Sequence, residues 1–107
     1  MKTKNYVLRQ IRISNKLYKG IKQYCKTNKK TMTQLYNEVL TWFINSVAQT
    51  TTQVYHASYK QGQMLSLWLE ESQIKIISQL ALQAKVSEAR VIYTAVILYS
   101  QKVNKFY

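Results

Sequence analysis

The sequence predicts a mainly α-helical domain with a two-stranded antiparallel β-ribbon, in the element order βαα-βαα within one chain. Each half opens with a short stretch of alternating residues and continues with two stretches whose apolar residues recur at helical spacing. A shift of 56 positions superposes the two halves without a gap, which indicates a duplicated unit. The units span residues 1–49 and 62–107, a Thr- and Gln-rich linker over 50–61 joins them, and together they are expected to form one compact domain.

The first unit begins with a predicted strand over 7–13, where β-branched residues alternate with polar ones. Ser14 and Asn15 are suited to cap the helix that follows. Along that helix, apolar residues recur at Tyr18, Ile21, Tyr24 and Cys25. After a polar turn, Thr31 and Gln34 form a capping box that starts a second helix. Its apolar stripe comprises Leu35, Tyr36, Val39, Leu40, Phe43, Ile44 and Val47.

The second unit repeats this order of elements. A strand is predicted over 64–69 and a helix over 70–85. Ser87 is expected to cap a last helix that runs to about Val103. Superposing the halves places apolar or aromatic residues on one another throughout the predicted core. Because successive side chains of a strand point to opposite faces, four of them are expected to face the helices, namely Ile11, Ile13, Leu67 and Leu69.

The charged residues argue against catalysis. Sixteen Lys and Arg stand against four acidic residues, giving a formal net charge of +12, and all four acids are Glu. With one His and one Cys, the chain lacks the ligand cluster of a zinc site and the acid-held base of a catalytic triad. No enzyme activity, metal or cofactor is therefore expected, and Cys25 is expected to be a buried structural thiol.

The same composition predicts the partner. No apolar stretch approaches the ~20 residues of a membrane span, so a soluble, cytoplasmic protein is expected. A charge of +12 favours a polyanionic partner. Nucleic acid is the first candidate, and an anionic membrane surface is the second.

Two segments resemble a known family. Preceded by a strand, a helix and a turn, Thr31–Tyr36 (TMTQLY) looks like the start of the second helix of the ribbon-helix-helix (Arc/MetJ-like) DNA-binding family. Lys85–Val96 (KVSEARVIYTAV) is closer still to that helix's signature. The chain departs from the pattern at Lys29 and Lys85, where the family often has Gly in the turn. Two copies in one chain resemble the relaxosome accessory proteins of the TraY type.

The resemblance implies that the ribbon lies in the DNA major groove. Side-chain alternation then predicts the base-contacting residues, namely Leu8, Gln10, Arg12, Met64, Ser66 and Trp68. Helix N-termini and nearby polar or basic residues are expected to contact phosphates, at Lys2, Lys4, Arg9, Lys29, Lys30, Thr31, Thr33, Lys85 and Ser87. Arg9 has the parity of an inward-facing residue, so it is expected at the frayed end of the ribbon.

Two apolar features have alternative interpretations. Trp68 contacts DNA, packs on another molecule, or lies in the core if its strand is bulged. Trp42, Ile97 and Leu98 occupy second-helix positions that are usually polar in the family, which favours an oligomer interface. The alternative is packing against linker residues, among them Val54, Tyr55 and Tyr59.

Together these features predict a sequence-specific double-stranded DNA-binding protein, with transcriptional repression as the first hypothesis. The alternative is an accessory protein of a conjugative relaxosome that binds an origin of transfer, and a third hypothesis is an antitoxin or protein-interaction module. Candidate further partners are copies of itself on adjacent sites and a relaxase or other DNA-processing protein; no membrane partner is expected. Residues 1–50 carry +9 and residues 51–107 carry +3, and the two strands of the ribbon differ in sequence. The DNA site is therefore expected to be asymmetric, with direct repeats as one form of it.

Overall fold

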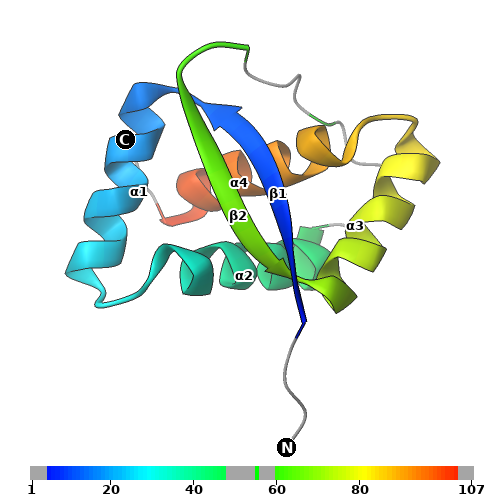
Figure 1. Cartoon of the computed structure of the whole chain (residues 1–107), viewed down its shortest axis with the longest axis horizontal. Helices are drawn as coiled ribbons and strands as arrows, with labels where there is room; N and C mark the ends of the chain where they lie inside the picture. The colour runs from blue at the N-terminus through cyan, green and yellow to red at the C-terminus, as the bar shows by residue number, and fades with distance from the viewer. Residues whose placement is uncertain (1–4, 48–54, 56–59, 104–107) are drawn as a thin grey trace, which may run out of the picture.

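The computed structural model describes residues 5–47, 55 and 60–103 (Figure 1). Along these ranges lie β1 Tyr6–Ile13, α1 Asn15–Thr27, α2 Met32–Trp42, a π-helical turn Phe43–Val47, β2 Gln63–Glu70, α3 Glu71–Ala84 and α4 Glu88–Val103. The predicted mainly helical domain with one two-stranded antiparallel sheet is therefore confirmed. Most of the predicted linker, 50–61, lies outside the described residues. None of the described helices is both long enough and apolar enough to cross a membrane.

The two strands form an antiparallel ribbon, with Gln10 opposite Ser66 near its middle. In Figure 1 the ribbon crosses in front of α2 and α4, while α1 and α3 lie on its two sides. The inward-facing side chains are buried, as predicted for Ile11, Ile13, Leu67 and Leu69. Leu65 is buried with them, so period-two alternation holds along β2 from Met64 to Leu69.

The core lies between the ribbon and the two central helices. α2 and the π-helical turn bury the predicted apolar stripe at Leu35, Tyr36, Val39, Leu40 and Phe43. α4 contributes the facing set, with Val91, Ile92, Ala95, Val96 and Tyr99 all buried. Ile44 is half-buried, and the side chain of Val47 lies outside the described part of the chain. The second-helix stripe is thus confirmed as far as Phe43.

The buried face of α1 differs by one position from the predicted one. The structure buries Leu17, Ile21 and Cys25, whereas the predicted members Tyr18 and Tyr24 are half-buried at its margins. Leu17 and Tyr18 are adjacent and point only ~100° apart around the helix. The sequence pattern therefore did not distinguish which of the two is buried. The prediction for Cys25 is confirmed as to burial, and this burial raises the pKa of the thiol.

The predicted helix caps form as expected. The Ser14 hydroxyl accepts a hydrogen bond from the backbone N–H of Leu17 at 3.1 Å. In the capping box, the Gln34 N–H donates to the Thr31 hydroxyl at 3.1 Å, and the Thr31 N–H donates to the Gln34 side chain at 2.9 Å. The Ser87 hydroxyl accepts from the Arg90 N–H at 3.2 Å. Each of these contacts satisfies an amide that the helix itself leaves without a partner.

The turns after α1 and α3 adopt the same motif, with a lysine in the left-handed region. Lys29 has a φ of 55° and Lys85 a φ of 58°. In the second turn, the Lys85 N–H donates to the Leu82 carbonyl at 3.3 Å, and the Val86 N–H donates to the Ala81 carbonyl at 3.0 Å. This is the Schellman motif, whose left-handed position favours glycine. Lys29 and Lys85 are the two positions where the chain departs from the Gly of the family pattern.

Replacing Lys85 by Gly is therefore expected to stabilise the fold. The Cβ of a non-glycine residue makes the left-handed conformation unfavourable, by roughly 1–2 kcal/mol. Glycine loses more backbone entropy on folding, so the net gain in the free energy of unfolding is about 1 kcal/mol. Urea unfolding measures the change. Lys26→Gly, inside the last turn of α1, is the control and should be destabilising by about 1 kcal/mol. Equal effects of the two variants would contradict the interpretation.

Candidate nucleic-acid interface

The outer face of the ribbon carries all six predicted base-contacting residues. Each of them is exposed, namely Leu8, Gln10, Arg12, Met64, Ser66 and Trp68. Trp68 is 50% exposed, so the alternative that places it in the core is wrong. Tyr6 extends this face at the start of β1 and is 44% exposed, although the sequence analysis did not single it out. Extending the alternation of β1 by two residues before Leu8 would have predicted that Tyr6 lies on this face.

Cross-strand pairs define the arrangement of this face. Leu8 lies opposite Trp68, and Arg12 lies opposite Met64. Between them, the Gln10 side-chain amide donates a hydrogen bond of 3.3 Å to the Ser66 hydroxyl. The Arg12 guanidinium makes no hydrogen bond or ion pair with the described part of the chain, and the side chain is exposed. The five donors of an exposed guanidinium suit it to contact a ligand of the ribbon.

Six of the nine predicted phosphate contacts lie at the starts of α2 and α4 or in the turns before them. Thr31 and Ser87 are exposed N-terminal caps, and Thr33 is half-buried in the first turn of α2. Lys29 and Lys85 are exposed in the turns that lead into these helices. The first amides of a helix and its dipole favour an anion at that end. Two further predicted cations, Lys2 and Lys4, lie outside the described residues.

Arg9 lies where the sequence analysis did not expect it. It pairs with Leu67 inside the ribbon, so the expectation of a frayed end is wrong. Its Nε lies 3.1 Å from an Oε atom of Glu88, the first residue of α4. The other carboxylate oxygen accepts a 2.6 Å hydrogen bond from the Ser78 hydroxyl on α3. An arginine is tolerated on the inward face because a carboxylate lies within reach, and this contact links β1, α3 and α4.

The Glu88 contacts predict a pH dependence. The Ser78 hydroxyl and then Arg9 hold the pKa of the Glu88 carboxyl below its usual value, against an opposing effect of burial. A depressed folded-state pKa contributes stability that is complete above the unfolded-state pKa, ~4.3, and is lost as the pH falls through the folded-state value. Ser78→Ala should raise the Glu88 pKa, as measured by NMR titration of the carboxyl group. The free energy of unfolding, measured by urea denaturation, should also decline less steeply in this variant as the pH falls below ~4.3. An unchanged pKa in Ser78→Ala would contradict this assignment.

Lys30 is also paired with a carboxylate. Its Nζ lies 2.6 Å from an Oε atom of Glu38 on α2, and this contact raises the pKa of the ammonium group. A lysine held by a glutamate loses part of its attraction for phosphate. Among the predicted phosphate contacts, Arg9 and Lys30 are thus already neutralised within the protein.

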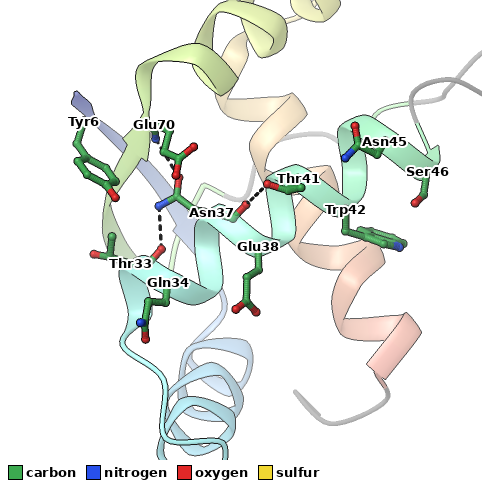
Figure 2. Close-up of a pocket in the computed structure, with 10 residues that line it drawn as sticks. All are labelled: Tyr6, Thr33, Gln34, Asn37, Glu38, Thr41, Trp42, Asn45, Ser46 and Glu70. Carbon is green, nitrogen blue, oxygen red and sulfur yellow. Dashed lines mark hydrogen bonds between the residues drawn. The ribbon is translucent and has the colours of Figure 1, made fainter. Parts of the chain in front are cut away.

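A shallow groove on the outer side of α2 contains much of the chain's acidity (Figure 2). Its lining residues are Tyr6, Thr33, Gln34, Asn37, Glu38, Thr41, Trp42, Asn45, Ser46 and Glu70. The amide of Asn37 donates to the Thr33 carbonyl at 2.8 Å and to the Trp68 carbonyl at 3.0 Å, and its oxygen accepts from the Glu70 N–H at 2.9 Å. These hydrogen bonds of Asn37 therefore hold the end of β2 against α2. Glu38 and Glu70, two of the chain's four acidic residues, lie along this groove.

Trp42, Ile97 and Leu98 are half-buried and pack against the core. The ring of Trp42 packs edge-on against Tyr99, with centroids 5.5 Å apart, and the Lys102 ammonium lies 5.2 Å from the Trp42 centroid. Their role as an oligomer interface stays a prediction.

The alternative prediction is that these residues pack against the linker. Of the three linker residues named for it, the structure describes Tyr55 alone. Val54 and Tyr59 lie outside the described residues. The centroids of the Tyr55 and Phe43 rings lie 6.3 Å apart. The backbone carbonyl of Tyr55 accepts a 2.9 Å hydrogen bond from the Arg90 guanidinium. This part of the linker therefore lies against the π-helical turn and α4.

The described ranges contain no cluster of three or more His, Cys, Asp or Glu residues suited to a metal ion. Comparison of the chain with protein-family models, with curated proteins and with solved structures found no match. The function is therefore inferred from the residues and contacts of the chain itself.

Proposed function

We propose that this chain is a sequence-specific double-stranded DNA-binding protein that inserts its β-ribbon into the major groove. The observation that carries the proposal is the exposed outer face of the ribbon, where Gln10, Arg12 and Ser66 present hydrogen-bonding groups. The net charge of +12 supplies attraction to a polyanion. The proposed mechanism is binding alone, with no catalytic step.

The major groove and the ribbon fit each other in size and chemistry. B-DNA has a major groove about 12 Å wide, which admits a two-stranded β-ribbon. Arg12 is suited to donate two hydrogen bonds to a guanine, and Gln10 to pair with an adenine. Helix N-termini at Thr31 and Ser87 are suited to hold the flanking phosphates, together with Lys29 and Lys85. The ribbon contacts would recognise the bases, and the helix contacts would position the protein on the DNA backbone.

We further propose that the chain is a tandem ribbon-helix-helix protein, with two units forming a pseudodimer. Ser66 follows Gln10 by 56 positions, and the two residues are partners in the ribbon. Pairing about this point is what a two-fold relation between the units requires. The matching turns at Lys29 and Lys85, also 56 positions apart, further support a duplicated unit.

Transcriptional repression is the biological role that we propose first, since a protein without catalytic groups acts by occupying its site. The second candidate is an accessory protein that binds an origin of transfer for a relaxase. Two strand-helix-helix units in one chain favour this second role, because the resemblance associates that arrangement with relaxosome accessory proteins. An antitoxin or interaction module remains the alternative from another class, and its binding would persist at high salt.

The experiment is to select fragments of the source replicon with the purified protein near ~150 mM salt, where non-specific charge attraction is screened. Footprinting then locates the bound sites. A site over a promoter supports a repressor, and a site beside a nick sequence supports a transfer accessory protein. Failure to enrich any fragment over random DNA contradicts sequence-specific binding.

Arg12→Ala tests the proposed orientation of the ribbon. Loss of a bidentate guanine contact is expected to weaken binding to the selected site by roughly 1–3 kcal/mol and to relax specificity at that base pair. Lys19→Ala is the control, because Lys19 is an exposed lysine of α1 without a predicted role in base recognition. It should affect specific and random duplexes alike in a fluorescence-anisotropy titration. Equal loss on both duplexes for Arg12→Ala would show that Arg12 does not contact a base.

A further inference from the structure

The outer face of the ribbon has two chemically different ends on either side of its Gln10–Ser66 centre. We propose that they bind DNA in a single orientation, with guanine under the Arg12 end and thymine methyl groups under the Leu8–Trp68 end. This inference rests on the proposed function and adds the chemical class of the DNA site.

The register of the ribbon separates the two ends. Arg12 opposite Met64 is the pair on one side of the centre, and Leu8 opposite Trp68 is the pair on the other. Two equivalent strands related by a two-fold axis would carry the same pair on both sides. Here one side offers a guanidinium beside Met64, which is 40% exposed, whereas the other offers no charge and two large apolar side chains, Leu8 and Trp68, that are 41% and 50% exposed.

The charges of the segments that follow the two strands also differ between the two ends of the ribbon. β1 leads from Arg12 directly into α1, which has lysines at 16, 19, 22 and 26, all exposed, and no acidic residue. β2 leads from Trp68 into Glu70 and Glu71, and α3 carries a single lysine, Lys75. Among the described residues, the segment after Arg12 is therefore basic and the segment after Trp68 is acidic, and reversing the protein on its site would exchange these unequal ends.

Each end matches a different feature of the major groove. Guanine presents O6 and N7 acceptors to a guanidinium, and thymine presents its C5 methyl group to apolar side chains. Arg12 and Leu8 are four residues apart on one strand, or about 13 Å at ~3.4 Å per residue. That distance spans at most about four base-pair steps at ~3.4 Å of axial rise, because the groove is inclined to the helix axis. The proposed site therefore has guanine and thymine positions separated by about this distance.

The test uses the duplex selected under the proposed function, with base analogues placed in one half of the site at a time. 7-Deazaguanine lacks the N7 acceptor, and deoxyuridine lacks the methyl group of thymine. At the Arg12 end, 7-deazaguanine should weaken binding by about 5- to 100-fold. At the opposite end, deoxyuridine should weaken it by about fourfold for each buried methyl group.

Two variants assign each effect to its side chain. Arg12→Ala should abolish the effect of 7-deazaguanine and leave that of deoxyuridine, and Trp68→Ala should do the reverse. Both side chains are exposed, and thermal unfolding checks that each variant folds. If Trp68→Ala proves unstable, Leu8→Ala replaces it as the variant for the apolar end.

The outcomes separate this inference from the proposed function. Specific binding that is equally sensitive to 7-deazaguanine in both halves, or indifferent to deoxyuridine everywhere, overturns the inference while the proposed function stands. Specific binding unchanged by Trp68→Ala and Leu8→Ala overturns it as well, and leaves the apolar end as a surface for another protein. Absence of any specific binding overturns both.

Discussion

Leu67→Ala is expected to lower the free energy of unfolding by about 2–5 kcal/mol, because it leaves a cavity under the ribbon. Leu67 is 0% exposed on the inner face of β2, and its side chain belongs to the core between the ribbon and the helices. A domain of this size has roughly 5–15 kcal/mol of stability in total, so this one change removes a large share of it.

Leu8→Ala is the matched control for this prediction. Leu8 has the same side chain in the same ribbon, but it lies on the outer face and is 41% exposed. Its truncation is expected to change stability by less than about 1 kcal/mol, since exposed apolar groups lose little on removal. Urea unfolding followed by circular dichroism measures both variants. Comparable losses in the two variants would show that the two faces of the ribbon are assigned wrongly.

The ribbon and the caps were predictable because their signals are local. A period of two determines which face of a strand is buried, and burial of Ile11 and Leu67 follows from alternation alone. Thr31 and Gln34 are three residues apart, so their reciprocal hydrogen bonds are visible as a sequence pattern. The lysines in the two Schellman turns were likewise visible as departures from glycine, at Lys29 and Lys85.

The contacts that position the ribbon were not predictable, because their partners are distant in sequence. Asn37 bonds groups that are 31 and 33 residues away, and Arg9 reaches Glu88 across 79 residues. An asparagine inside a helix and an arginine inside a strand are ordinary surface residues by local rules. The burial of Trp42 likewise depends on Tyr99 from another helix. Such pairs become visible only when the helices are placed around the ribbon.

The salt dependence of DNA binding is expected to reflect four of the six predicted cationic phosphate contacts. The six are Lys2, Lys4, Arg9, Lys29, Lys30 and Lys85. Arg9 and Lys30 are ion-paired with Glu88 and Glu38 at 3.1 and 2.6 Å, so neither is expected to release a counterion on binding. Four contacts give a slope of about −3.6 in log K against log salt, or a loss of about 150-fold in affinity between ~50 and ~200 mM salt. Six contacts would give about −5.4 and roughly 2,000-fold.

Glu38→Gln separates these two cases, because it removes the carboxylate that neutralises Lys30. The variant is expected to bind DNA more tightly at low salt and to steepen the slope by about 0.9, the value for one added phosphate contact. Glu71→Gln is the control, since it changes the net charge equally but pairs with Lys75, which has no predicted phosphate contact. It should leave the slope unchanged in anisotropy titrations over the same salt range. A wild-type slope near −5.4 that Glu38→Gln does not alter would mean that DNA displaces both Glu38 from Lys30 and Glu88 from Arg9, so that both cations contact phosphates.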